Sequence, residues 1–133
     1  MIRQWLLQCG ACLWAVGAVA ADYYVAPGGD DGGPGTLAEP WATIQHAADT
    51  AAAGDTVHIR AGVYEERVVI NVSGTPGNPV ILRSFAGETA ILDGSNLAPP
   101  VGDSAMLWVE NRSHVVILGL EIRNYRTSNN QCF

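Results

Sequence analysis

Short β-prone segments recur along most of this chain at a nearly constant spacing, and this spacing limits the possible folds more than any other feature. The step from Val57 to Val80 is 23 residues (80 − 57), and the step from Val69 to Ile91 is 22 (91 − 69). A period in the twenties is typical of a solenoid, in which each repeat forms one coil and stacks on its neighbours. A longer step of 35 residues (115 − 80) separates Val80 from Val115.

The predicted strands are short and are separated by clusters of Gly, Pro, Asn and Asp, which form turns. They cover residues 56–59, 67–70, 80–83, 90–92, 106–109 and 115–122, and a short β-prone run at 22–26 precedes them. In a solenoid, each strand pairs in parallel with its equivalent one coil on, and inward side chains stack into apolar columns. We therefore expect Val57 or Ile59 to stack with Val80 or Leu82, and Ile70 to stack with Leu92.

An antiparallel sandwich is the alternative, because its strands also recur every 8 to 12 residues. The phase of the repeats and the lack of tight Asn-Gly hairpins favour the solenoid. A single amphipathic helix precedes the repeats. Pro40 suits its first turn, Trp41 and Ile44 begin its apolar stripe, and Gly54 is the expected C-terminal cap. About three turns of helix are expected to cover the open first edge of the solenoid.

Residues 1–21 are predicted to be a secretory signal peptide. Arg3 is followed by an uncharged, mostly apolar stretch and then by small residues up to Ala21. A transmembrane anchor is the alternative, but the apolar stretch is short for a span of ~20 residues. Cys9 and Cys12 lie within this segment, so the expected secreted or periplasmic domain, residues 22–133, keeps only Cys132. A single cysteine builds no disulfide framework.

The charge balance excludes several classes of function. Seven Arg and no Lys oppose 13 Asp and Glu, which gives a formal net charge of −6. Without a basic cluster the chain is a poor candidate for binding nucleic acid, because phosphates are neutralised by clustered cations. The absence of Lys removes Schiff-base chemistry and any Lys general base. No membrane association is expected once the signal segment is removed.

Three segments near the start of the expected domain and two further along carry a resemblance to a known family. They are residues 24–36 (YVAPGGDDGGPGT), 40–47 (PWATIQHA), 53–64 (AGDTVHIRAGVY), 78–82 (NPVIL) and 117–124 (ILGLEIRN). Together they resemble the start of secreted right-handed parallel β-helix proteins, closest to polysaccharide lyases of the pectate lyase L and chondroitinase B type. The resemblance covers residues 22–126 and is more specific for fold than for reaction.

The resemblance implies an all-β solenoid, a right-handed parallel β-helix with a short N-terminal capping helix. Members are several hundred residues long and cleave acidic, uronic-acid glycans by β-elimination, assisted by calcium and using a Lys or Arg base. This chain has no Lys and room for about three coils. We expect residues 22–133 to be the cap and first coils, truncated at the C-terminus and inactive alone, with catalytic residues beyond Phe133.

No catalytic or cofactor-binding residue is therefore assigned in this chain, its metal site is unknown, and calcium is expected only in the full-length protein. The alternative function is a non-catalytic β-helix that binds carbohydrate or serves as a cell-surface scaffold. In either case the unpaired C-terminal edge of the last coil favours self-association.

Several polar residues suggest chemistry but have simpler structural interpretations. Asp30 and Asp31 offer calcium ligands, yet their Gly-rich loop suits a tight turn better. His46, His58 and His114 lack metal-ligand spacing, and His58 is expected to point outward. The carboxylates of Asp55, Glu65, Glu66 and Asp93 lie at caps, bends and turns.

Three asparagines, each following a predicted strand, form the last candidate feature. They are Asn71, Asn111 and Asn124. If the coils stack in register, these side chains form an amide ladder at the turns. Asn71 and Asn111 also begin glycosylation sequons, which matter only in a eukaryotic secretory host.

Overall fold

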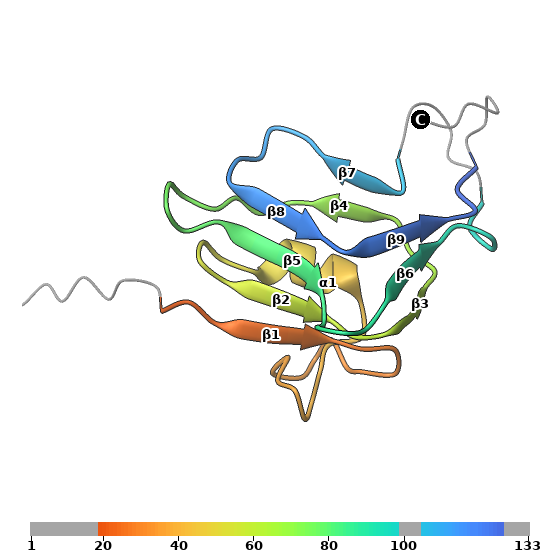
Figure 1. Ribbon diagram of the computed structural model, residues 1–133, viewed down its shortest axis with the longest axis horizontal. Coiled ribbons are helices and arrows are strands. Elements are labelled where there is room, and N and C mark those ends of the chain that lie inside the picture. Colours follow the sequence, from red (N-terminus) through yellow and green to blue (C-terminus); the bar gives the residue numbers. More distant parts are fainter. Residues whose placement is uncertain (1–18, 99–104, 127–133) are drawn as a thin grey trace, which may run out of the picture.

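The chain winds as a coil of parallel strands around one apolar core. The computed structural model describes residues 19–98 and 105–126. Within them the order of elements is β1 (Asp22–Val25), α1 (Ile44–Thr50), β2 (Thr56–Ile59), β3 (Gly62–Tyr64), β4 (Val68–Ile70), β5 (Val80–Ser84), β6 (Ala90–Asp93), β7 (Leu107–Val109), β8 (Val115–Leu118) and β9 (Leu120–Arg123). Figure 1 shows successive coils stacked upward from β1 to β8.

Three parallel sheets form the walls of the coil. Sheet A has the order β1-β2-β5-β8, sheet B has β3-β6-β9, and sheet C has β4-β7. Every pairing between these strands is parallel, and Val57 faces Leu82 while Val80 faces Val115. The predicted solenoid, its parallel stacking and the 35-residue step are confirmed, and the antiparallel sandwich is wrong.

The predicted stacking of Ile70 with Leu92 is wrong. Ile70 pairs with Val109 in sheet C, whereas Leu92 pairs with Tyr64 in sheet B. The 22-residue step thus compared two different walls of the coil. The error came from β3, which has only three residues and begins at a glycine that the sequence marks as a turn. When β3 is not recognised, the remaining strands of sheets B and C look like one repeating set in the sequence.

One predicted strand, residues 115–122, is divided in two. Gly119 has φ 72° and separates β8 from β9. This backbone conformation is accessible to glycine at little cost and turns the chain from sheet A into sheet B within a single residue. Because of this corner, the single run of residues 115–122 contributes strands to two sheets.

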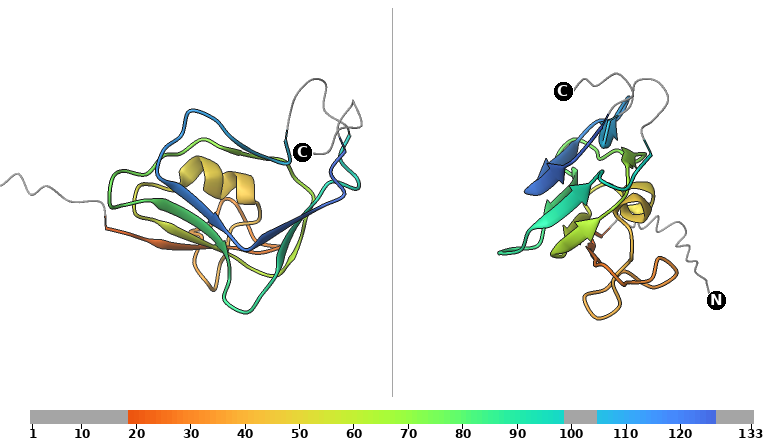
Figure 2. Two further views of the ribbon diagram at one scale, coloured as in Figure 1. Left: turned by 45° about the horizontal axis from the view of Figure 1, so that its top comes forward. Right: turned by 90° about the vertical axis from the view of Figure 1, so that its right-hand side faces the viewer.

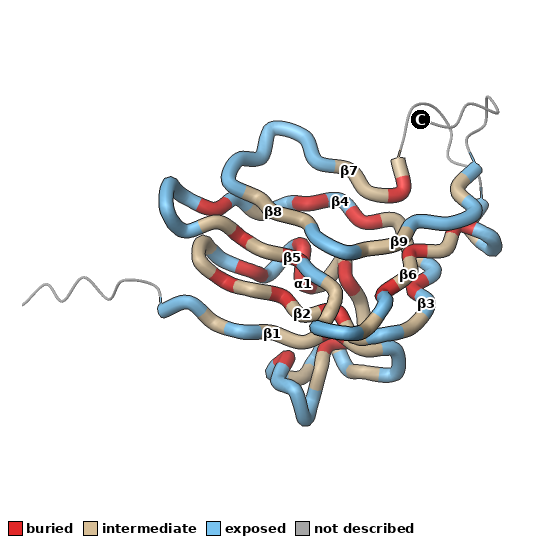
Figure 3. Tube along the Cα trace, in the orientation of Figure 1, coloured by how far each residue is buried: buried red, intermediate tan, exposed pale blue. Residues whose placement is uncertain are grey.

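The core lies inside the coil and follows the alternation of each strand. On β2, Val57 and Ile59 are buried and His58 points outward, as predicted. Figure 3 shows buried positions alternating with more exposed ones along the inner strands. Burying a side chain of this size contributes about 1.5–3 kcal/mol. The fully buried large side chains are Val25, Ile44, Val57, Ile59, Val68, Ile70, Val80, Leu82 and Leu92.

Helix α1 caps the coil on the side of sheet C. It buries Ile44, Ala47 and Ala48 and packs mainly against β4, and the left view of Figure 2 shows it within the outline of the coil. The side chain of Gln45 accepts from the Val69 N–H at 2.7 Å and donates to the Val69 carbonyl at 2.9 Å. The edge of β4 is thereby paired by a side chain.

The helix is shorter than predicted. It begins after the N-cap Thr43, whose hydroxyl accepts from the His46 N–H, and ends at the C-cap Ala51. Gly54 is not the cap, because its positive φ of 93° belongs to the turn after the helix. In the turn after the helix, the Asp55 carboxylate accepts the Ala52 N–H at 2.8 Å.

The Gly-rich loop, rather than the helix, covers the free edge of β1. Tyr24 donates its N–H to the Gly35 carbonyl at 2.8 Å and accepts the Trp41 N–H at 2.9 Å. Trp41 is buried, and its indole stacks on Tyr23 with ring centroids 4.5 Å apart. Figure 1 shows this loop below β1. Pro40 and Trp41, expected in the helix, therefore belong to the cover of the first strand.

Candidate functional site

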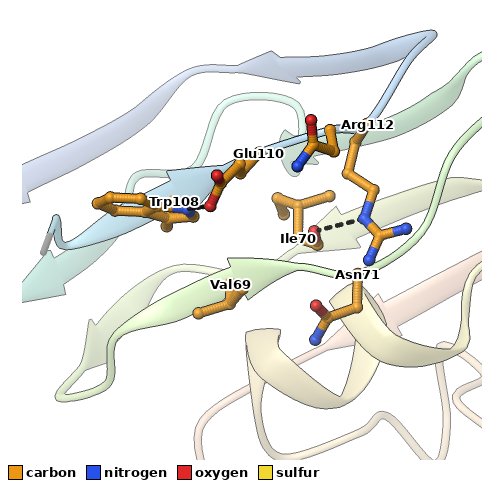
Figure 4. Close-up of a pocket in the computed structure, with 7 residues that line it drawn as sticks. Val69, Ile70, Asn71, Trp108, Glu110 and Arg112 are labelled. Atoms are coloured by element: carbon orange, nitrogen blue, oxygen red, sulfur yellow. Dashed lines mark hydrogen bonds between the residues drawn. The ribbon is translucent and has the colours of Figure 1, made fainter.

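A groove crosses the outer face of sheet C, where β4 and β7 lie side by side. Its cavity is about 250 Å³ in volume and is lined by Val69, Ile70, Asn71, Trp108, Glu110, Asn111 and Arg112. Val69 and Trp108 face one another in register. Figure 4 shows the indole of Trp108 and the guanidinium of Arg112 at opposite ends of the groove.

The polar groups of the groove are partly fixed by one another. The Trp108 Nε1–H donates to Glu110 Oε2 at 3.0 Å. The Arg112 Nε–H donates to the Ile70 carbonyl at 3.3 Å, drawn as the dashed line in Figure 4. The Asn71 amide donates to Asp49 Oδ1 on α1 at 2.6 Å. Both terminal nitrogens of Arg112 are without a partner among the described residues.

The local fold explains why these residues meet. On β4 and β7, Ile70 and Val109 alternate with outward Val69 and Trp108, so one wall presents its polar and aromatic side chains together. Asn111, with φ 52°, then turns the chain two residues after β7. This turn brings Arg112 back over the edge of sheet C. The last side chain of the groove comes from a residue beyond the strand.

This set of groups suits a saccharide that carries a carboxylate. Trp108 is half-buried, and its indole offers an apolar face with a polar edge. Carboxylate and amide oxygens accept hydroxyl protons, and amides also donate. A guanidinium matches a carboxylate with two parallel hydrogen bonds. The groove therefore has the means to bind an acidic sugar, while its residues form no nucleophile–base pair.

The structure gives Asp30 and Asp31 structural roles. Asp30 Oδ1 accepts the Gly32 N–H at 2.8 Å. Both oxygens of Asp31 are used, by the N–H groups of Ala42 and Thr43 and by the Thr43 hydroxyl. Partial burial opposes ionisation of Asp31, but the Thr43 and Ala42 hydrogen bonds outweigh it and lower its pKa. These hydrogen bonds agree with the tight-turn interpretation of the loop.

The paired carboxylates at residues 65 and 66 point to different partners. Glu65 accepts from Asn96 at 2.7 Å, whereas Glu66 accepts the first two helical N–H groups, of Ile44 at 2.8 Å and Gln45 at 2.9 Å. Burial raises the pKa of Glu66, although these two hydrogen bonds oppose the shift. The two groups therefore do not form a catalytic pair.

Asp55 and Asp93 also serve the backbone. Asp55 is 5% exposed and accepts the Ala21 N–H at 2.9 Å in addition to that of Ala52. Asp93 accepts the Ser95 N–H at 2.8 Å, and the hydrogen bonds from Ser95 hold its pKa below its usual range. The structural interpretation of both residues is confirmed.

The three histidines lie on separate elements. His46 on α1 packs edge-on against Trp41, His58 on β2 contacts Asp22 Oδ1 at 2.9 Å, and His114 is exposed in a turn. Over residues 19–98 and 105–126, no three His, Cys, Asp or Glu side chains gather in a way that would hold a metal ion.

The predicted asparagine ladder does not form. Asn71 binds Asp49, while Asn124 binds Asp93 at 3.2 Å on a different wall of the coil. Asn71 and Asn111 do share a place, because both line the groove. No sequence pattern had singled out Trp108 or Arg112 as a site residue. An outward tryptophan between two inward residues of β7 was the available signal.

A second aromatic cluster lies on the outer face of sheet A. Tyr24 stacks on His58 with centroids 5.0 Å apart, and the Arg60 guanidinium lies 4.9 Å from the Phe85 centroid. Arg60 also binds Glu88 through two nitrogens, and this pair lowers the Glu88 pKa. Because the rings are stacked on one another, their faces are less available to a sugar than that of Trp108.

Some predictions concern residues that the structure does not describe. These are Cys9, Cys12, Cys132, most of the predicted signal segment at 1–21, and the end of the chain at 127–133. In the part that the structure does describe, no helix has the length and apolar character needed to cross a bilayer.

Comparison with known proteins identifies the family. Residues 23–133 match the family described as Pel9A-like, right handed beta helix region. The uncharacterized protein YwoF of Bacillus subtilis strain 168 is 34% identical over 113 residues, which are 84% of this chain and 24% of that protein. Pectate lyase PEL9 of Emericella nidulans is 40% identical over 95 residues, covering 66% of this chain and 23% of that enzyme.

Solved structures agree with the fold. A rhamnogalacturonan lyase superposes with a TM-score of 0.67 at 23% identity, over 77% of this chain and 28% of that one. The chain spans about a quarter of the length of the curated relatives it matches. The parallel coils and the family match agree, and the chain belongs to the Pel9A-like family of right-handed β-helix proteins, related to polysaccharide lyases.

Proposed function

We propose that residues 22–133 form the cap and first coils of a secreted polysaccharide lyase that cleaves acidic, uronic-acid glycans by β-elimination. The 40% identity to a pectate lyase over 95 residues carries this proposal. Residues 1–21 act as its signal peptide and direct it out of the cytoplasm. The coils described above then serve as the scaffold on which a longer β-helix continues.

The chemistry requires groups that these coils do not bring together. In β-elimination a base takes the proton from C5 of the uronate, the C4–O4 bond breaks, and a C4–C5 double bond forms. In a productive complex, the general base must lie within about 2.6–3.2 Å of C5, which carries that proton. The chain has no Lys, and among residues 19–98 and 105–126 no carboxylate cluster suited to calcium lies beside Arg112. We place the base and the ion in later coils.

The test is a lyase assay on the secreted full-length protein and on residues 1–133. With polygalacturonate, the full-length protein is expected to raise the absorbance of unsaturated uronate, and the 133-residue chain is expected to show no rise. A full-length protein inactive on every acidic glycan would refute the lyase function. Activity of the 133-residue chain would refute the assignment of catalysis to later coils.

The groove supports a second candidate, a non-catalytic β-helix that binds carbohydrate. It combines Trp108 with Arg112 but has no nucleophile or base pair. Such a protein would bind the glycan without producing unsaturated product. Glycan binding by an inactive full-length protein would favour this function.

We also propose that the chain associates with itself when produced alone. The inward side chains of the last coil are poorly covered, since Val109 and Ile122 are each 48% exposed. The strands β7, β8 and β9 also have one neighbour each in the described sheets. Free parallel edges beside apolar side chains are templates for pairing. Light scattering showing a monomer at all concentrations would contradict this.

A further inference from the structure

We propose that the groove between β4 and β7 binds an acidic glycan, with Arg112 holding a uronate carboxylate at one end and Trp108 stacking on a sugar ring at the other. This inference rests on the proposed function for its substrate class, and it adds a binding site outside the catalytic machinery. The site would anchor the chain of sugars on the first coils while other coils act on it.

Arg112 is the group that selects a carboxylate. Its Nε–H is held by the Ile70 carbonyl at 3.3 Å, which keeps the guanidinium at the end of the groove opposite Trp108 (Figure 4). The terminal nitrogens have no partner among the described residues. Two parallel N–H groups match the two oxygens of a carboxylate, an arrangement that a single ammonium does not reproduce.

Trp108 provides the apolar wall. Its Nε1–H is fixed by Glu110 at 3.0 Å, so the ring orientation is set before a ligand arrives. Figure 4 shows the indole along the outer side of β7, with Val69 on the neighbouring strand. Val69 is 41% exposed and extends the same surface. The C–H groups on one side of a sugar ring pack on such a surface, while its hydroxyls reach Glu110 and Asn71.

Size and charge narrow the ligand further. A cavity of about 250 Å³ is below the usual range for drug-sized ligands, so a short stretch of glycan fits it better than a bulkier ligand. The chain carries a net charge of −6, so an acidic glycan is repelled overall and needs a local cation. Arg112 is the cation that lines this groove. Binding is therefore expected to depend on the guanidinium and to weaken as added salt screens it.

The experiment is calorimetric titration of the 133-residue chain with a galacturonate oligomer, its methyl ester and a neutral galactose oligomer. We expect binding of the acid alone. R112Q and W108A are each expected to weaken it roughly tenfold, which corresponds to about 1.4 kcal/mol. R83Q is the matched control, because Arg83 is exposed on the outer face of sheet A, away from the groove. It is expected to leave the affinity unchanged.

The outcomes separate this inference from the lyase function. Equal binding of acid, ester and neutral oligomers, an unchanged affinity in R112Q, or no binding of the acid would each overturn the site. A full-length enzyme that still cleaves polygalacturonate would then retain its function without it. Acid-selective binding lost in R112Q and kept in R83Q would support the site even if the full-length protein proves inactive. Circular dichroism of each variant confirms that its sheets are intact.

Discussion

The alternation of β4 can be tested by truncating two neighbouring residues, Ile70 and Val69. Ile70 is 1% exposed and belongs to the core, whereas Val69 is 41% exposed and faces the groove. Removing buried methyl and methylene groups from Ile70 costs the transfer free energy and leaves a cavity. Ile70→Ala is therefore expected to lower the free energy of unfolding by about 2–5 kcal/mol.

Val69→Ala is the matched control on the same strand. It removes fewer buried atoms and loses mainly β-propensity, so its cost is expected to stay under about 1 kcal/mol. Urea unfolding followed by circular dichroism measures both changes, with the slope of each curve checked against the unaltered chain. The measurement is made at a protein concentration where the chain is monomeric.

The alternation of β4 is tested by comparing the two losses in the free energy of unfolding. A large loss for Ile70→Ala with a small one for Val69→Ala supports an inward Ile70. Equal losses, or a larger loss for Val69→Ala, would refute the alternation, since a strand shifted by one residue exchanges its two faces. The groove would then lose its wall, because Trp108 is paired in register with Val69.

Three further changes test the cap and its carboxylates. Asp55→Ala leaves the N–H groups of Ala21 and Ala52 unpaired; it is expected to cost about 2–4 kcal/mol in chemical denaturation, and a loss under 0.5 kcal/mol would contradict the role of this carboxylate. Gly35→Ala forces φ 72° on alanine and places its Cβ 2.5 Å from the Trp41 ring; a melting temperature lowered by several degrees is expected, and an unchanged one would contradict the close packing of the loop. Burial raises the pKa of Glu66, so the folded state holds this proton more tightly than the unfolded state. Its contribution to stability is present below the unfolded pKa and is lost as the pH rises through the folded pKa. The stability of the unaltered chain relative to Glu66→Gln should therefore fall between acidic and neutral pH in thermal melts, and a rise would contradict the sign of the shift.

The fold could be predicted from the sequence because the patterns that specify it, strand alternation and turns, are local and repeat in every coil. Alternating residues such as Val57, His58 and Ile59 and the turns between strands are visible in any window of the chain. Strand β3 was not predicted, because three residues that begin with a glycine show almost no periodic pattern. The helix was overestimated because Trp41 continues the apolar stripe of α1 while its backbone pairs with β1. Tertiary hydrogen bonds decided that boundary.

The groove was harder to predict than the fold. It is built from residues 39 positions apart in sequence (107 − 68, from the pairing of Val68 with Leu107), and their register follows from the inserted loop between β6 and β7. Asn71 and Asn111 were singled out as a structural ladder, although both line the groove. Arg112 lies beyond a turn at positive φ, so its direction depends on the backbone of Asn111. Such geometry carries no periodic signal.

The most direct test of the stacked parallel coils is nuclear Overhauser spectroscopy across β2 and β5. Neighbouring strands lie about 4.8 Å apart, which brings backbone protons of facing residues within range. The structure predicts contacts from Thr56 to Ile81, Val57 to Leu82 and His58 to Arg83, so the residue numbers of the paired positions increase together along both strands. Contacts that rise along one strand while falling along the other would show antiparallel pairing and contradict the β-helix.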